Sequence, residues 1–173
     1  MESRASQIAR QIERLKVLVV DDEPAMRKVA RALLQSIGIA NIHEARDGRD
    51  GLEAICARPP DIVLLDWEMP SPNGPEFMRM LRSPGTFPLP DVPVIMVTGY
   101  SERSRVVEAV RLGVNEYLLK PVSSAALLAR IVSILIRPRP MIKRGDYYGP
   151  EPRRLASYKP ESAADLSEIV LID

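Results

Sequence analysis

Two short apolar runs that end in carboxylates constrain this chain more than any other feature. Residues 17–20 run directly into Asp21 and Asp22, and residues 62–65 run directly into Asp66. A continuous apolar run of this length is typical of a strand buried on both faces, and a charge at its buried end is costly. Two strands that both end in this way predict one shared site.

The chain between residues 16 and 137 alternates apolar runs with segments of helical period. The apolar runs cover residues 17–20, 42–45, 62–65, 94–97 and 117–119. The helical stripes are Met26, Val29, Ala30, Leu33, Leu34 and Ile37, which Gly38 ends, then Leu52, Ile55 and Cys56, then Phe77, Met80 and Leu81, and then Val106, Ala109 and Val110. Repeated strand–helix units predict an α/β protein whose parallel sheet carries helices on both faces.

Chemically active residues follow four of these runs: Asp21, Asp22, Asp66, Thr98 and Lys120. They are expected at the same edge of the sheet, where ligands of such folds bind. Three carboxylates within roughly 5 Å repel one another by a few kcal/mol per pair, and a hard cation such as Mg²⁺ relieves this repulsion. Asp66 could then attack a phosphoryl group, while Lys120 and Thr98 bind its oxygens.

Four segments in this order, "VLVVDDEP", "IVLLDWEMPSPNG", "IMVTG" and "EYLLKP", resemble the receiver domain of two-component response regulators. The resemblance covers residues 16–137 and implies a single-domain, chemotaxis-regulator-like protein. Its expected fold is a flavodoxin-like, doubly wound, five-stranded parallel sheet of order 2-1-3-4-5. Residues 1–15 are then an N-terminal helical extension, and residues 138–173 a largely irregular or disordered C-terminal tail.

The resemblance also implies a role for each site residue. Asp66 is the phosphoacceptor, and Mg²⁺ is bound by Asp21, Asp22, Asp66 and the backbone carbonyl of Glu68. Thr98, Lys120 and Tyr117 bind the phosphoryl group or switch with it, Lys120–Pro121 is a cis peptide, and Gly74 belongs to the loop after the third strand.

The expected function is therefore phosphorylation-dependent signalling. A histidine kinase or histidine phosphotransfer protein phosphorylates Asp66, and the surface of helix 4, strand 5 and helix 5 changes to control a downstream protein partner or a homodimer. The protein is not expected to be an enzyme beyond self-phosphorylation and self-dephosphorylation.

Three other functions are alternatives to this one. The first alternative is a receiver-like interaction module that is never phosphorylated. A haloacid-dehalogenase-like phosphatase would need a second Asp where this chain has Glu68. A flavodoxin-like cofactor carrier would need a neutral, amide-rich first loop, but here that loop is acidic.

Two departures from the family pattern stand out. Glu68 and Tyr100 each lie two residues after a site residue, where attacking water would enter, so they are expected to change the lifetime of phospho-Asp66. The proline-rich segment "RSPGTFPLPDVP" is expected to be a rigid surface loop.

Composition excludes several classes of partner and site. Lys and Arg number 24 against 23 Asp and Glu, so no strong field favours nucleic acid or a membrane. No apolar segment reaches membrane-span length, and the first residues lack the apolar core of a signal peptide, so a cytoplasmic location is expected. Cys56 and His43 are the only residues of their types, which argues against an internal disulfide, a histidine-based triad and a histidine-rich zinc site.

The segments outside the resemblance carry further patterns. Ile8, Ile12 and Leu15 predict a short leading helix. The last receiver helix carries a core stripe of Leu127, Ile131, Ile134 and Leu135, and a second stripe of Leu128, Val132 and Ile136 for a partner, another copy or the chain's own tail. The tail is too short for a DNA-binding domain, and "DLSEIVLID" is a candidate docking segment.

Overall fold

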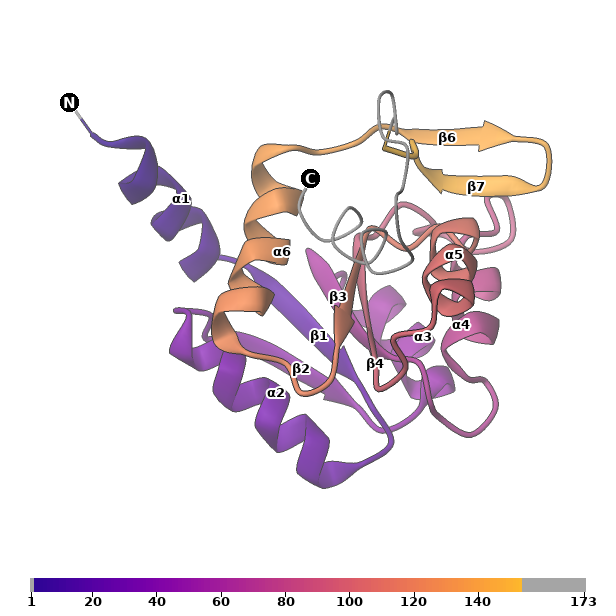
Figure 1. The fold of residues 1–173 in the computed structure, drawn as a ribbon, viewed down its shortest axis with the longest axis horizontal. Helices are drawn as coiled ribbons and strands as arrows, with labels where there is room; N and C mark the ends of the chain where they lie inside the picture. The colour runs from indigo at the N-terminus through magenta and orange to yellow at the C-terminus, as the bar shows by residue number, and fades with distance from the viewer. Residues whose placement is uncertain (1, 154–173) are drawn as a thin grey trace.

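A five-stranded parallel sheet with helices on both faces forms the centre of the protein (Figure 1). The structure, a computed structural model, describes residues 2–153. The strands of the sheet are β1 (Lys16–Val20), β2 (Asn41–Ala45), β3 (Ile62–Asp66), β4 (Val94–Thr98) and β5 (Glu116–Leu119). Their order is β2-β1-β3-β4-β5, and every neighbouring pair is parallel, so the predicted fold class is confirmed.

The described part of the chain has six helices, of which α1 projects away from the sheet (Figure 1). They are α1 (Arg4–Glu13), α2 (Pro24–Ser36), α3 (Gly48–Ala57), α4 (Gly74–Leu81), α5 (Arg103–Arg111) and α6 (Ser124–Ile136). Because α1 precedes the first strand, the helices that the sequence predicted as helix 4 and helix 5 of the receiver are α5 and α6. Residues that favour helix N-termini mark where two of these helices begin. Asn73 forms a capping box with Glu76 at the start of α4, and Pro24 is the first residue of α2.

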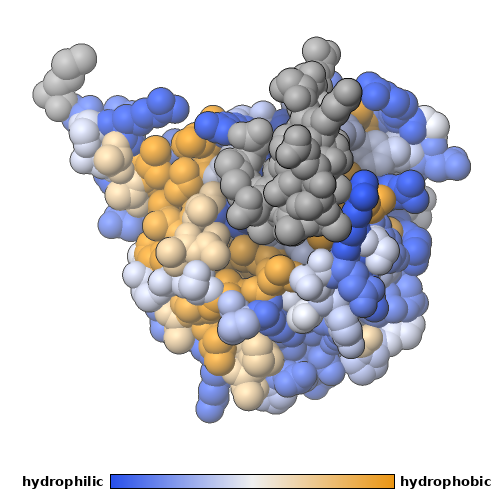
Figure 2. Space-filling view, in the orientation of Figure 1, coloured by the Kyte–Doolittle hydropathy of each residue, from blue (hydrophilic) through white to orange (hydrophobic). Residues whose placement is uncertain are grey.

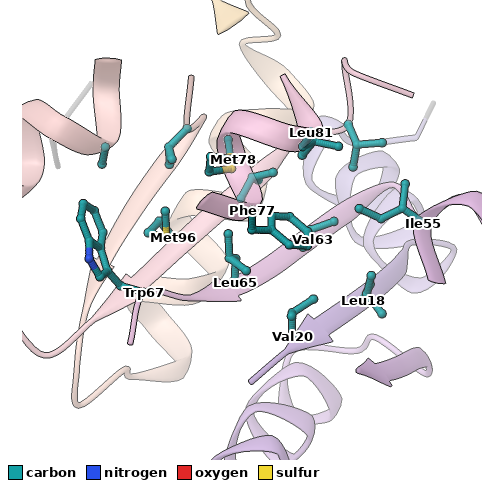
Figure 3. Close-up of a cluster of buried hydrophobic side chains, with 14 of the residues drawn as sticks. Leu18, Val20, Ile55, Val63, Leu65, Trp67, Phe77, Met78, Leu81 and Met96 are labelled. Carbon is teal, nitrogen blue, oxygen red and sulfur yellow. The ribbon is translucent and has the colours of Figure 1, made fainter. Parts of the chain in front are cut away.

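The two faces of the sheet bury separate apolar cores. One core joins the sheet to α3, α4 and α5 through Ile55, Phe77, Met78 and Ala109, with Trp67 beside Met96 at its edge (Figure 3). The other joins the sheet to α2 and α6 through Leu34, Leu127 and Ile131, and Ile12 and Leu15 extend it to the α1 end of the chain. Alternate residues of the strands supply the two cores, which explains why the inner strands β1, β3 and β4 are apolar except at one end, whereas the edge strand β2 is not.

Several residues predicted to face the core lie on the surface instead. Met80 is 45% exposed, whereas Met78 is fully buried, so the buried stripe of α4 is Phe77, Met78 and Leu81. Burial of Gly74 and Pro75 at the start of α4 fixes this rotation of the helix. Val29, Cys56 and Val110 are also exposed. Single positions within a helical stripe were therefore less predictable than the stripe itself.

The chain after α6 differs from the predicted irregular tail. β6 (Met141–Arg144) and β7 (Tyr147–Pro150) form an antiparallel hairpin, with Gly145 at its turn at φ +61. The hairpin packs on the turn after α5, where an added Cβ on Gly149 would lie 2.7 Å from the Cα of Gly113. The expectation of irregular chain is thus wrong for Met141–Pro150, while "DLSEIVLID" lies outside the described residues. The division of the chain at residues 15 and 137 stays a prediction.

Apolar surface gathers on the side of the molecule that carries α2 and α6 (Figure 2). Val29 of α2 is 48% exposed, and Leu128, Val132 and Ile136 of α6 are half-buried. No helix among residues 2–153 is long and apolar enough to cross a membrane.

Candidate functional site

The carboxyl ends of four neighbouring strands bring the predicted site residues together. Asp66 is the last residue of β3 and Thr98 the last residue of β4, while Asp21 follows β1 and Lys120 follows β5. The register aligns Val20 with Leu65, Asp66 with Val97 and Thr98 with Leu119. Parallel pairing therefore places the five side chains predicted from the strand ends at one edge of the sheet, at the switch point of the topology.

Three carboxylates form a compact oxygen cluster at this edge. Asp21, Asp22 and Asp66 each offer an oxygen, and the three oxygens lie within 4.8 Å of one another. Asp22 Oδ1 is buried and has no hydrogen-bond partner among the described residues. An unpartnered carboxylate oxygen beside two other carboxylates fits a hard divalent cation such as Mg²⁺. The carbonyl of Glu68 stays a predicted ligand only.

Lys120 neutralises the most deeply buried of these carboxylates. Its Nζ donates to Asp66 Oδ1 at 2.9 Å, and the Asp66 side chain is only 3% exposed. Burial raises the pKa of Asp66 to about 6, and the Lys120 hydrogen bond offsets only part of this effect. Burial alone would lower the pKa of Lys120, but the bond to Asp66 and the nearby carboxylates raise it. Burial also raises the pKa of Asp21.

The Thr98 hydroxyl lies in the same site but is bonded to Glu68. Thr98 Oγ1 donates to Glu68 Oε1 at 2.9 Å and accepts from the backbone N–H of Tyr100 at 3.1 Å. Thr98 is fully buried. The sequence predicts a role for the carbonyl of Glu68 and an effect of its side chain on water access, but the bond from Thr98 to this side chain was not predictable from the sequence.

Tyr117 is buried beneath the loop after β4. Its hydroxyl donates to the carbonyl of Tyr100 at 2.8 Å, and the whole residue is 4% exposed. Burial raises the pKa of the Tyr117 phenol. Tyr100 therefore contacts Thr98 through its N–H and Tyr117 through its carbonyl, so one residue connects both predicted switch side chains.

Arg105 is a site residue that the sequence analysis missed. Its guanidinium lies over the ring of Trp67, 5.0 Å from the centroid, and over the ring of Tyr100, 4.9 Å from the centroid. The stack ties the first turns of α5 to the loops after β3 and β4. A cation shortly after a site aromatic was the only signal in the sequence, and such signals are common.

Gly74 and Pro121, the two residues predicted to have a structural role, lie next to the site. An added Cβ on Gly74 would lie 2.8 Å from the Cα of Trp67 and 3.0 Å from the carbonyl oxygen of Asp66. Glycine is therefore required for α4 to begin so close to the end of β3. The Lys120–Pro121 peptide is cis, and so is Ser71–Pro72.

A narrow apolar groove of about 120 Å³ leads from the site between α2 and α6. Asp66 and Lys120 line it together with mostly apolar residues, among them Met26, Val29, Pro121 and Val122. The Asp66 carboxylate therefore borders a surface that is mostly apolar.

Comparison with known proteins gives a consistent result for most of the chain. The family model of the response regulator receiver domain matches residues 17–132. Chemotaxis protein CheY-3 of Vibrio cholerae is 34% identical over 123 residues, which are 71% of this chain and 93% of that protein. Chemotaxis protein CheY of Pseudomonas aeruginosa is 35% identical over 123 residues, which are 71% of this chain and 98% of that protein.

Solved structures are similar over the same region. Vibrio cholerae chemotaxis protein CheY4 has a TM-score of 0.61 at 28% identity, and the match covers 69% of this chain and 98% of that one. The receiver domain of the Francisella response regulator 1452 also has a TM-score of 0.61 at 28% identity, covering 68% of this chain and 93% of that one.

Proposed function

The chain belongs to the response regulator receiver domain family of two-component signalling, and from that premise we propose that Asp66 accepts a phosphoryl group from a phosphohistidine. The donor is a histidine kinase or a histidine phosphotransfer protein. The observation that carries this proposal is the environment of Asp66: the carboxylate is buried, 2.9 Å from the Lys120 ammonium, and part of a three-carboxylate cluster. As a family member, the chain is a signalling regulator rather than a classical enzyme.

The transfer uses the residues of the site in separate roles. A carboxylate oxygen of Asp66 forms the new O–P bond while the N–P bond of the phosphohistidine breaks, and the electron pair of that bond stays on the imidazole nitrogen. Lys120 and Thr98 provide N–H and O–H donors for the phosphoryl oxygens. Self-phosphorylation by small acyl phosphates and self-dephosphorylation would use the same residues.

Asp21, Asp22 and Asp66 would hold Mg²⁺, together with the carbonyl of Glu68. The unpartnered Asp22 Oδ1 supports this assignment, because a buried carboxylate oxygen without a donor is costly. When bound, Mg²⁺ supplies positive charge that offsets the clustered carboxylates and the incoming phosphoryl oxygens.

The groove between α2 and α6 is the proposed approach for the donor. A phosphohistidine carried on a helix with an apolar face would bury Val29 and Met26 as its imidazole reached Asp66. Since both the groove and the exposed surface around it are apolar, the donor surface should be apolar as well.

The output surface is proposed to comprise α5, β5 and α6. Tyr117 and Lys120 connect its end to the phosphorylation site, and Arg105 connects α5 to the same site. At the other end of β5, Arg153 donates to Glu116 and to Ser133 of α6, so the chain itself covers this part. A protein partner would use the end near Tyr117. A homodimer through this surface and a cytoplasmic location stay predictions.

The direct test is intact mass after incubation with Mg²⁺ and a small acyl phosphate, with Asp66→Asn as the control. The proposal expects one added phosphate on the parent protein and none on the variant. If neither protein gains phosphate while Mg²⁺ occupancy is demonstrated, the constitutive interaction module becomes the better function. Sustained release of phosphate from a phosphomonoester would instead favour the phosphatase alternative.

A further inference from the structure

The Thr98 hydroxyl is already committed to a partner other than a phosphoryl group. Its O–H donates to Glu68 Oε1 at 2.9 Å, and its oxygen accepts from the N–H of Tyr100. A hydroxyl has a single hydrogen to donate, so Thr98 cannot bond Glu68 and a phosphoryl oxygen at the same time. Thr98 is fully buried, whereas Glu68 is half-buried, so water can reach the Glu68 carboxylate once this bond breaks.

Glu68 lies within the electrostatic field of the phosphorylation site. Its carboxylate contributes to raising the pKa of both Asp66 and Lys120, so its charge acts on both groups. The phosphoryl group of phospho-Asp66 would add roughly 1.5 to 2 negative charges beside this carboxylate. Glu68 thus opposes phosphorylation through its charge and separately through its hydrogen bond to Thr98.

We propose that Glu68 is a positioning residue that holds the Thr98 hydroxyl in the unphosphorylated arrangement, so that Glu68 and the phosphoryl group compete for the same O–H. This inference rests on the proposed function of Asp66 as phosphoacceptor. It assigns a task to the side chain of Glu68 that is distinct from metal binding by its carbonyl. The phosphorylated arrangement then requires the Thr98–Glu68 bond to break and Glu68 to turn to solvent.

The competition between Glu68 and the phosphoryl group for the Thr98 hydroxyl also affects Tyr100. Tyr100 donates its N–H to Thr98 and accepts from the Tyr117 hydroxyl through its carbonyl, and its ring stacks on Arg105. When the phosphoryl group takes the Thr98 hydroxyl, the N–H contact of Tyr100 moves with it. Glu68 is therefore linked through Thr98 to Tyr100, which contacts both Tyr117 and Arg105 of α5.

The test measures binding of beryllofluoride, a tetrahedral mimic of the phosphoryl group, to the full chain with Mg²⁺. Trp67 is the only tryptophan and follows Asp66 directly, so its fluorescence reports occupancy. Glu68→Ala removes both the acceptor and the charge, whereas Glu68→Gln removes the charge and keeps an acceptor oxygen. We expect Glu68→Ala to tighten binding by up to about tenfold more than Glu68→Gln does, the upper size expected for one hydrogen bond to a neutral acceptor.

A double-mutant cycle with Thr98→Ala separates the hydrogen bond from the charge. Without the Thr98 hydroxyl, Glu68→Ala and Glu68→Gln should bind beryllofluoride equally well. Equal affinities of the two Glu68 variants with Thr98 present would overturn the competition, and so would a difference that persists in the Thr98→Ala background. If the parent protein binds no beryllofluoride and gains no phosphate by mass, the proposed function itself fails, which is a separate outcome.

Discussion

The guanidinium of Arg105 is held between the rings of Trp67 and Tyr100, at 5.0 and 4.9 Å from their centroids. Trp67 is 4% exposed and Tyr100 is 48% exposed, so the stack joins a buried ring to a surface ring across the start of α5. This contact places a residue of α5 against the loop that follows Asp66. It connects the site directly to the proposed output surface.

Arg105→Ala should open this stack. Each of the two cation–π contacts contributes roughly 0.5–1 kcal/mol at a partly exposed site, so the variant should lose about 1–2 kcal/mol of unfolding free energy. Trp67 should also become more accessible to acrylamide, which fluorescence quenching measures. Arg103→Ala is the matched control, because Arg103 is an exposed arginine at the start of the same helix. Equal quenching in the two variants would contradict the role assigned to Arg105.

Arg82→Ala should be among the most destabilising substitutions of the chain. The buried Arg82 guanidinium donates to the carbonyls of Gly113, Pro90 and Val92 and to Asn115 Oδ1 at 2.6–3.0 Å. Burial lowers the pKa of Arg82 to about 10. Its loss leaves buried carbonyls without donors, which costs about 3–5 kcal/mol. Urea unfolding should show this loss, while Arg79→Ala on the exposed face of α4 should change stability by less than about 0.5 kcal/mol.

The strand ends show how far the sequence was informative. An apolar run followed by a charged residue indicates a buried strand and its end, so the placement of Asp66 and Lys120 at one edge of the sheet was predictable before the structure. The bond between Glu68 and Thr98 and the stacking of Arg105 on two rings were not predictable, because side-chain contacts between separate loops leave no periodic signal in the sequence. Likewise, "RSPGTFPLPDVP" was expected to be only a rigid loop, yet its first residue, Arg82, donates to the carbonyls of Pro90 and Val92 within the same segment. Asp91 of this loop also accepts a hydrogen bond from Tyr148 of the hairpin.

Gly149→Ala should separate the hairpin from the turn after α5. The new Cβ would lie 2.7 Å from the Cα of Gly113, and backbone cannot give way as a side chain can. Amides of β6 and β7 should then exchange hydrogen for deuterium at least tenfold faster, since a loss of about 1.4 kcal/mol in local opening free energy corresponds to that factor.

Gly145→Asn is the control for this substitution within the same hairpin. Gly145 has φ +61 and open space around it, and asparagine tolerates that left-handed conformation better than most residues. The hairpin should therefore keep its protection in this variant. Fast exchange in both variants would mean that the turn, rather than the Gly149–Gly113 contact, limits docking.

Asp66→Asn should stabilise the metal-free protein in a pH-dependent manner. Burial raises the pKa of Asp66 to about 6 in the folded protein, against an ordinary value of 3.8. Between these values the folded state holds a proton that the unfolded state has released, so the free energy of unfolding of the parent falls as the pH rises from about 4 to about 6. The shift of about two pH units corresponds to at most about 3 kcal/mol.

Asparagine carries no charge at any pH, so the stability advantage of Asp66→Asn should be small at pH 4.5 and reach its maximum above pH 7. Urea unfolding of both proteins with a chelator at the two pH values measures the difference directly. Adding Mg²⁺ at pH 7.5 should shrink the advantage, because a cation at Asp21, Asp22 and Asp66 favours the charged carboxylate. An advantage that is the same at both pH values would show that the folded protein does not raise the pKa of Asp66.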